Sequence, residues 1–555
     1  MLAVNLLKTP IFWELAGWLA FLVVGGLCIL SDFRRQLPRW QQIGLLLALV
    51  GFLVTNRLLL LFFNRELNPD ESQLLSQAIT LFHHPVYWQS TDGATMGPLS
   101  SYFASLPAYL GHPLDYIALR RTAFFCLLVT LISGYFTIEN LFNPRTARLA
   151  LLPGFAFLAF TYNHDFLHAT NEQLSLALLG LTFWQYSRLW RKQTFDSVGG
   201  MAVLSFISSL IPFAKLQGVP TALVIVAAGL LGLWSQRQKL TAPRFWSALV
   251  GLVAGGVAFP LLVVFLTWQF GVFEDFKQFY LFGNLSYSAG ASFWDYLIRF
   301  PAFVIRTTDF LVFLIPTFGL LIAGVLLGRK DEKKNGLLVF ILASLVASGY
   351  AVIKPGSEFM HYLLYLVTPV CLLNAWFIDR LMSPVFTGAW VALIGLCFGV
   401  NAAMQHGKLA LEPLNAYRLQ PFQLQQLFIS PTSQAVQKYA RSGEDLVVWG
   451  WAPRYNVEMQ MPQGVCDNHT IRCIIGGAEA QKIHRARYIR NITASRPPVF
   501  LDAVGPNSFW LSDRATQGYE NFPELRNFID TNYRFAGETD KNRIYIRTDR
   551  LSQQN

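Results

Sequence analysis

The chain has 555 residues, of which 53% are hydrophobic and only 14% are charged, and its mean hydropathy is +0.37. A water-soluble enzyme of this size cannot stay in solution with such a balance, so the composition excludes that class and indicates a membrane protein. Much of the net charge of +11 comes from basic residues in short segments between apolar runs. Basic residues there orient helices and meet anionic membrane lipids, so we expect no nucleic-acid partner.

Apolar runs of a length that suits membrane helices recur along the first 405 residues. Most are about 17 to 25 residues long, enough to cross about 30 Å of hydrocarbon as a helix, and we expect about twelve spans. The first run carries Glu14 and lacks a cleavage site of small residues, so we interpret it as a retained span rather than a signal peptide. The runs are 12–30, 42–62, 122–138, 148–162, 173–187, 200–213, 218–234, 246–268, 301–328, 336–353, 359–378 and 388–404.

Basic residues concentrate in every second connection between these runs. Arg145 and Arg148 lie in one such connection, and Arg237 and Lys239 lie in another. The positive-inside rule places these connections in the cytoplasm. We therefore expect the other connections to face outward, together with the tail that begins at about residue 406.

The first outward segment, 64–120, is too long for a simple turn and contains amphipathic pieces. From Ser72 to Phe82, the apolar residues recur at helical intervals, and Pro98 to Leu110 repeats the pattern. We expect helices that lie in the membrane interface and roof an outward cavity.

Asp70 and Glu71 stand at the start of the first of these helices, just outside the second span. Acidic residues in a first turn cap free N–H groups and suit the helix dipole. A carboxylate at this depth can also meet both a lipid-borne group and a soluble partner. Capping and a functional role both fit the spacing.

The outward turn from His164 to Glu172 is dense in acids and imidazoles. If a span begins near Thr170, then Asp165, His168 and Glu172 lie near one face at intervals of three and four. Such a set can bind a metal ion, although a solvated loop explains it equally. We assign no metal ligand and leave a divalent-metal requirement open.

Two further polar positions lie beside apolar runs. Lys215 lies in a turn between two short spans, and this turn contains Pro and Gly. Its ammonium either binds an anionic lipid headgroup or extends to the membrane interface. His361 and Tyr362 open the span that leads to Pro369. A histidine at the end of a span can also be simply packed and hydrogen-bonded.

After about residue 406 the long apolar runs stop, and short strand-like runs alternate with polar helical stretches. We predict a membrane module at 1–405 and a small α/β domain at 406–555, with strands at 445–449, 498–504 and 543–547 and helices at 480–491 and 522–532. Cys466 and Cys473 stand seven residues apart in this tail. An oxidising compartment would join them in a disulfide.

These features together resemble the GT-C superfamily of glycosyltransferases that use polyprenyl-phosphate sugars, in particular the protein O-mannosyltransferases and the lipid A aminoarabinose transferases. One departure is Met96-Gly97-Pro98, where relatives often carry Lys-Pro-Pro, and another is an extra N-terminal span. The matching features are Asp70-Glu71, Asp92-Gly93 with Gly97-Pro98-Leu99 and Tyr102, Arg120-Arg121, Glu172, Lys215-x-Gln217, His361-Tyr362 with Pro369, and Trp449-Gly450 with Pro453 and Tyr455.

The resemblance implies a polytopic helix bundle and an inverting transferase in a bacterial inner membrane, with its active site and tail on the extracytoplasmic side. Asp70 would be the catalytic base, with Glu71 and Glu172 as supporting acids. A carboxylate aligns and deprotonates an acceptor hydroxyl, and cations stabilise the leaving phosphate. The implied partners are a polyprenyl-phosphate sugar, membrane lipids and a lipid, glycan or protein acceptor.

Arg121, Lys215 and His361 are the groups that we expect to hold the donor phosphate. Two other classes of protein stay open. One is an accessory membrane subunit that keeps the GT-C fold without activity. The other is a transporter or flippase of lipid-linked substrates, which would carry ionisable residues at mid-span. The substrate-binding residues that we expect are Asp165, His168, Arg121, Lys215, His361 and Tyr362.

Overall fold

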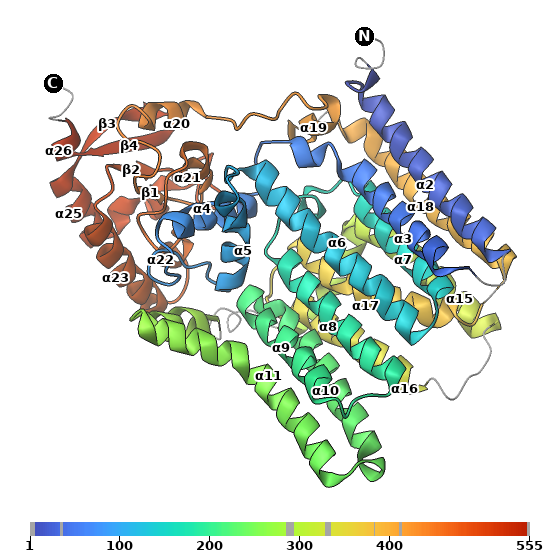
Figure 1. Cartoon of the computed structure of the whole chain (residues 1–555). Coiled ribbons are helices and arrows are strands. Elements are labelled where there is room, and N and C mark those ends of the chain that lie inside the picture. Colours follow the sequence, from blue (N-terminus) through green and yellow to red (C-terminus); the bar gives the residue numbers. More distant parts are fainter. Residues whose placement is uncertain are drawn as a thin grey trace. The chain divides into compact units, whose positions relative to one another are not determined.

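The computed structural model describes residues 6–33, 37–284, 293–327, 335–381, 383–409 and 413–551. The protein is mainly helical, with one small sheet near the C-terminus (Figure 1). Contacts divide the chain into two compact units. Unit 1 comprises Met1–Phe63, Ala123–Phe265 and Leu285–Leu424, and unit 2 comprises Asn64–Thr122, Leu266–Asn284 and Gln425–Asn555.

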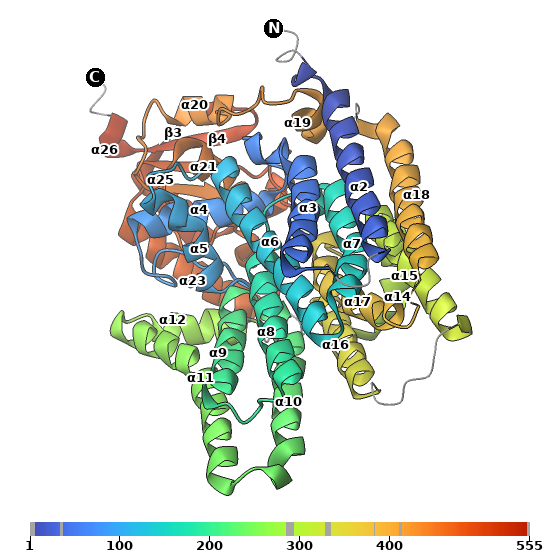
Figure 2. The same cartoon turned by 45° about the vertical axis from the view of Figure 1, so that its right-hand side comes forward.

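Unit 1 is a helix bundle. Its most buried members are α7 (Pro144–Phe160) and α17 (Leu364–Ile378), which pack on each other and whose side chains are almost all buried. At one edge α2 (Pro10–Asp32) packs on α3 (Arg39–Arg57) and on α18 (Pro384–Leu409) (Figure 2). The other helices of the bundle are α6 (Tyr116–Leu141), α8 (Glu172–Lys192), α9 (Val198–Ala214), α10 (Val219–Gln236), α11 (Ala242–Gln269), α14 (Phe293–Arg306), α15 (Thr308–Leu327) and α16 (Asn335–Ile353).

Every predicted apolar run coincides with a helix or, at 301–328, with the pair α14 and α15, which is bent by 94°. Among the described residues, seven helices are long and apolar enough to cross a membrane, or eight if the bent pair forms one span. The chain is therefore an integral membrane protein. The predicted number of about twelve spans is not confirmed, because the remaining helices on these runs are shorter or less apolar.

Short 3₁₀ helices lie in the connections between the longer helices of the chain. The turns are η1 (Leu60–Phe62), η2 (His164–Phe166), η3 (Leu216–Gly218), η4 (Arg237–Lys239), η7 (Met360–Leu363) and η8 (Pro413–Asn415), and the short helix α19 (Ala416–Leu419) follows the last of them.

Unit 2 contains a four-stranded sheet with the order β1-β2-β4-β3. β1 (Leu446–Trp449) pairs parallel with β2 (Val499–Asp502), and β4 (Asn542–Arg547) runs antiparallel to both β2 and β3 (Tyr533–Thr539). The prediction of a small sheet near the C-terminus is confirmed. β3 was not predicted: Asp540 and Lys541, both with positive φ, join it to β4 in a tight turn without the Asn-Gly or Asp-Gly pair that marks such hairpins.

Helices cover both faces of this sheet because its side chains alternate. Phe500 and Val447 face a core that includes residues of α23 (Ala478–Ser495) and α25 (Pro523–Asn532), while Val499 and Leu501 face a second core that includes α20 (Pro431–Val436) and α21 (Arg454–Met459). The smaller elements of unit 2 are α12 (Phe273–Asp275), the π-helix η5 (Phe276–Phe282), α22 (Ile471–Ile474), α24 (Arg514–Gln517), η9 (Tyr519–Asn521) and α26 (Thr548–Leu551).

The first long connection forms two helices, α4 (Pro69–His83) and α5 (Pro98–Tyr109), as predicted. In unit 2 α4 packs against α5 and α21, and it is buried on its polar face as well as its apolar face. Thr80 Oγ1 accepts a hydrogen bond from the backbone N–H of Gln463 (2.9 Å), so the tail covers that face. The expectation that α4 lies in the membrane interface stays a prediction. The domain boundary at 405/406 stays a prediction.

Cys466 and Cys473 are separate, buried thiols, so the structure does not form the predicted disulfide. Cys466 Sγ lies 2.8 Å from the carbonyl oxygen of Gln89. Cys473 instead packs in the core beside Trp449 and Tyr488. Burial raises the pKa of the Cys466 thiol to about 12, which keeps it protonated and unreactive.

We therefore expect both thiols to be free in protein isolated from its own membrane. Alkylation under native conditions should leave Cys466 and Cys473 unmodified because they are buried, and alkylation after unfolding without reductant should modify both. Peptide mapping by mass spectrometry measures this. A linked pair of peptides containing the two residues would contradict the structure.

Candidate functional site

A buried ion pair joins two helix ends in unit 1. Glu172 is the first residue of α8, and Lys215 directly follows α9. Lys215 Nζ lies 3.1 Å from Glu172 Oε1, and both side chains are almost completely buried. The sequence favoured an anionic headgroup or the interface as the surroundings of Lys215, and the structure places a carboxylate beside it. Sequence spacing does not show the pair because its members belong to different turns.

The turn that carries Lys215 depends on a close approach to α8. The backbone of Lys215 is extended, which ends α9, and Val219 and Pro220 then begin α10. Between them Gly218 lies so close to α8 that a Cβ atom would be 2.4 Å from Ser175 Oγ. Only glycine fits this packing, and the packing brings Lys215 to the beginning of α8.

His361 extends the cluster towards a second acid. Its Nε2 lies 4.0 Å from Glu172 Oε2, and its Nδ1 lies 3.7 Å from Asp165 Oδ2. Asp165 Oδ2 also accepts a hydrogen bond from the backbone N–H of Met360 (3.2 Å). Burial alone would raise the pKa of Asp165, but His361 and the nearby charge of His168 hold that pKa well below its usual range. Asp165 is therefore ionised at neutral pH.

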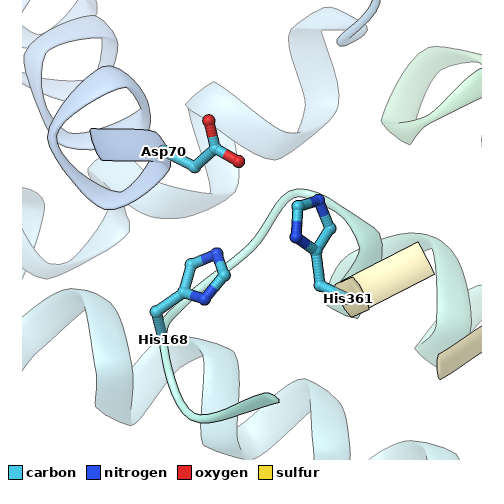
Figure 3. A group of neighbouring side chains, drawn as sticks. All are labelled: Asp70, His168 and His361. Atoms are coloured by element: carbon cyan, nitrogen blue, oxygen red, sulfur yellow. The ribbon is translucent and has the colours of Figure 1, made fainter. Parts of the chain in front are cut away.

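His168 is completely buried beside His361. The two imidazole rings are nearly perpendicular, with centroids 5.3 Å apart (Figure 3). His168 Nδ1 lies 2.8 Å from the carbonyl oxygen of His164. A carbonyl only accepts, so Nδ1 carries a proton. The other ring nitrogen, Nε2, has no hydrogen-bond partner among the described residues.

Tyr362 completes the predicted set in unit 1. Its ring packs edge-on against His361, with centroids 4.8 Å apart, and the Lys215 ammonium lies 5.9 Å from the ring centroid. The structure thus brings six predicted site residues together in unit 1, from three turns of the chain. They are Asp165, His168, Glu172, Lys215, His361 and Tyr362.

Asp70, Glu71 and Arg121 belong to unit 2. Asp70 lies in the first turn of α4 (Figure 3), where its backbone N–H donates to Asn68 Oδ1 at 3.0 Å. Asn68 is therefore the residue that caps the helix. The Asp70 carboxylate instead accepts a hydrogen bond from Gln73 Nε2 (3.0 Å) and is only half-buried. This placement weakens the capping interpretation of Asp70.

Glu71 has a structural ion pair. Arg120 Nε donates to its Oε1 at 2.7 Å, and Arg120 Nη2 lies 2.6 Å from its Oε2, with both side chains buried. Both carboxylate oxygens are thus occupied, which does not suit a supporting catalytic acid. The neighbouring Arg121 is exposed on α6.

Two buried charged residues near the unit 1 cluster were not predicted. Arg57 of α3 donates to the carbonyl oxygens of Leu158 (2.7 Å) and Phe166 (3.0 Å). Asp309 of α15 accepts hydrogen bonds from the chain that follows α7. The available signal was an ionisable residue inside an apolar run, which marks a functional or organising position by default.

No family model and no curated protein matches this sequence. Among solved structures, ArnT from Cupriavidus metallidurans bound to undecaprenyl phosphate matches with a TM-score of 0.54 and 13% identity, over 90% of this chain and 98% of that one. The apo state of the same protein gives a TM-score of 0.51 at 13% identity, over 91% and 98%. An oligosaccharyltransferase from Archaeoglobus fulgidus, in complex with zinc and sulfate, matches with a TM-score of 0.38 at 12% identity, over 80% of this chain and 64% of that one.

ArnT is the lipid A aminoarabinose transferase, one of the two groups that the sequence resembles. The ArnT likeness extends over nearly the whole of both chains. The prediction of a GT-C fold is confirmed: this chain has that fold.

Proposed function

We propose that the chain is a membrane glycosyltransferase that moves a sugar from a polyprenyl phosphate to a hydroxyl group of a lipid, glycan or protein. The observation that carries this proposal is the buried cluster of acids, imidazoles and one ammonium at the helix ends of unit 1. Its support is the fold shared with ArnT, whose structure holds undecaprenyl phosphate. The proposed location is a bacterial inner membrane, with the site facing outward.

In the proposed reaction the acceptor oxygen attacks the anomeric carbon of the sugar as the bond to the donor phosphate breaks. Attack from the side opposite the phosphate inverts that carbon. Asp70 takes the proton of the acceptor hydroxyl, and the polyprenyl phosphate leaves with an additional negative charge. Cations that bind the phosphate more strongly as this charge grows accelerate the step.

The ion pair changes the roles that we propose for Glu172 and Lys215. Lys215 contributes the fixed positive charge towards the phosphate, while Glu172 holds the ammonium in place and is not a catalytic acid. The charges of Lys215 and Glu172 cancel, and Asp165 adds one negative charge. A net positive charge that attracts a phosphate therefore requires both His361 and His168 to be protonated. Arg121 is proposed as a further phosphate contact.

The position of the cluster separates this proposal from its alternatives. Glu172 begins α8, Lys215 follows α9, and His361 lies in η7, so these ionisable groups stand at the ends of helices. A transporter or flippase would carry them at mid-span. An inactive accessory subunit could keep the same groups, and only activity measurements exclude it.

Asp70→Asn should lower the turnover number by about 10² or more and leave donor binding unchanged, because the amide cannot take a proton. Single-turnover transfer from a radiolabelled polyprenyl-phosphate sugar measures the first quantity, and lipid binding measures the second.

The matched control is Asn68→Ala, which removes the helix cap and should cost about 1 kcal/mol of stability without a comparable loss of turnover. If Asp70→Asn transfers sugar at nearly the wild-type rate, the residue is not the base. An inactive wild-type protein would support the accessory-subunit alternative.

Lys215→Ala should weaken both donor affinity and turnover, with Lys215→Arg intermediate because a planar guanidinium does not replace a compact ammonium. It also leaves Glu172 as a buried, unpaired charge, which destabilises the protein by itself. The double variant Lys215→Met with Glu172→Gln removes both charges together. We expect it to regain thermal stability while donor affinity stays low.

Thermal unfolding in detergent and lipid binding to the same preparations separate the two effects. Recovery of both stability and donor affinity in the double variant would make the pair purely structural and remove Lys215 from the phosphate site.

A further inference from the structure

We propose that Asp309 is a positioning residue, which holds the turn of Asp165 and His168 in its working conformation. The proposal rests on the proposed function, because it assigns a role in the same site. Asp309 is only 3% exposed and lies in the first turn of α15. An acid in that position can simply complement the helix dipole. The hydrogen bonds of Asp309, however, connect α15 to other segments of unit 1.

Both oxygens of Asp309 accept hydrogen bonds from other parts of unit 1. Oδ2 accepts from Thr161 Oγ1 at 2.5 Å, from the backbone N–H of Tyr162 at 2.7 Å and from that of Asn163 at 3.0 Å. Oδ1 accepts from Asn401 Nδ2 of α18 at 2.9 Å. Hydrogen bonds to an ionised acceptor are about twice as strong as neutral ones. One side chain thus fixes three consecutive residues.

These three residues lead directly into the site. α7 ends at Phe160, and after Asn163 the chain forms η2, which contains Asp165. Asn163 connects Asp309 to the site. Its Oδ1 accepts a hydrogen bond from the backbone N–H of Asp165 at 2.9 Å, and its Nδ2 lies 2.8 Å from Sδ of Met360, the residue before His361. Asp309 therefore acts on the Asp165–His361 contact through one intervening residue.

Two cations hold the same turn from other directions. Arg418 Nη2 donates to the carbonyl oxygen of Thr161 at 2.9 Å, and its guanidinium lies 4.4 Å from the centroid of the Tyr162 ring. Arg57 donates to the carbonyl oxygen of Phe166. Backbone groups that have left α7 would otherwise be buried without partners, at a cost of about 1–3 kcal/mol each. The turn is thus held by buried charged groups at both its beginning and its end.

A loosened turn would displace Asp165 and His168 from their positions in the site. Misplacing a reacting or binding group by about 1 Å can lower a rate by about 10². Asp309→Ala removes the acceptor of Thr161, Tyr162 and Asn163. Asp309→Asn keeps one acceptor oxygen but removes the negative charge that strengthens these hydrogen bonds. Both variants should loosen the turn while α15 itself, an apolar helix packed in the bundle, remains formed.

The test compares Asp309→Ala and Asp309→Asn with a control, Thr221→Val, in the full-length protein. Thr221 makes a buried hydrogen bond to Ser348 at 2.8 Å between α10 and α16, so the control loses a buried hydrogen bond elsewhere in unit 1. Hydrogen exchange followed by mass spectrometry reports on the peptide around 161–168 without needing any activity. We expect exchange there to accelerate at least tenfold in both Asp309 variants and not in the control.

Turnover at saturating donor should fall about tenfold or more in the Asp309 variants and much less in Thr221→Val. Unchanged exchange at 161–168, or accelerated exchange with wild-type turnover, would overturn the positioning role. If the wild-type protein transfers no sugar at all, the proposed function fails, and the exchange experiment still shows whether Asp309 holds the turn. A variant that unfolds entirely is replaced by Asn401→Ala, which removes one Asp309 contact and should accelerate the same exchange.

Discussion

The cost of burying charge is the constraint on which unit 1 depends. Moving an ionised side chain out of water costs several kcal/mol unless a partner of opposite charge or several hydrogen bonds replace the water. Glu172 and Lys215 satisfy that condition in large part by pairing with each other, which brings the beginning of α8 to the end of α9. His361 and Asp165 then tie η7 and η2 to the same place. The arrangement of three turns follows from the pairing of their charges.

The same rule organises unit 2. Arg120 and Glu71 join α6 to α4 through a buried pair with both carboxylate oxygens engaged. Arg487 of α23 donates to Asp92 of the first long connection at 2.7 Å and to Asp467 of the tail at 2.6 Å. These contacts explain why segments far apart in the sequence form one compact unit. They also explain why α4 is buried on its polar side, since the tail supplies the partners that water would otherwise supply.

Local patterns predicted the parts of the fold that local physics determines. Long runs of apolar residues marked the helices of the bundle, and short strand-like runs in the tail marked β1, β2 and β4. β3 was missed because the turn before β4 uses Asp540 and Lys541 instead of a recognisable hairpin pair. Six of the predicted site residues lie near one another in unit 1. The pairing of Lys215 with Glu172 could not be derived from the sequence, because the two residues belong to different turns and only tertiary packing joins them. The disulfide failed for the same reason, since spacing says nothing of where two side chains point.

The most direct measurement is native mass spectrometry of the lipid that copurifies with the protein from its own membrane. The account predicts a bound polyprenyl phosphate or its glycosylated form, retained in the wild type and lost when Lys215 and Glu172 are replaced together. Bound bulk phospholipid alone, with the same pattern in the double variant, would contradict it.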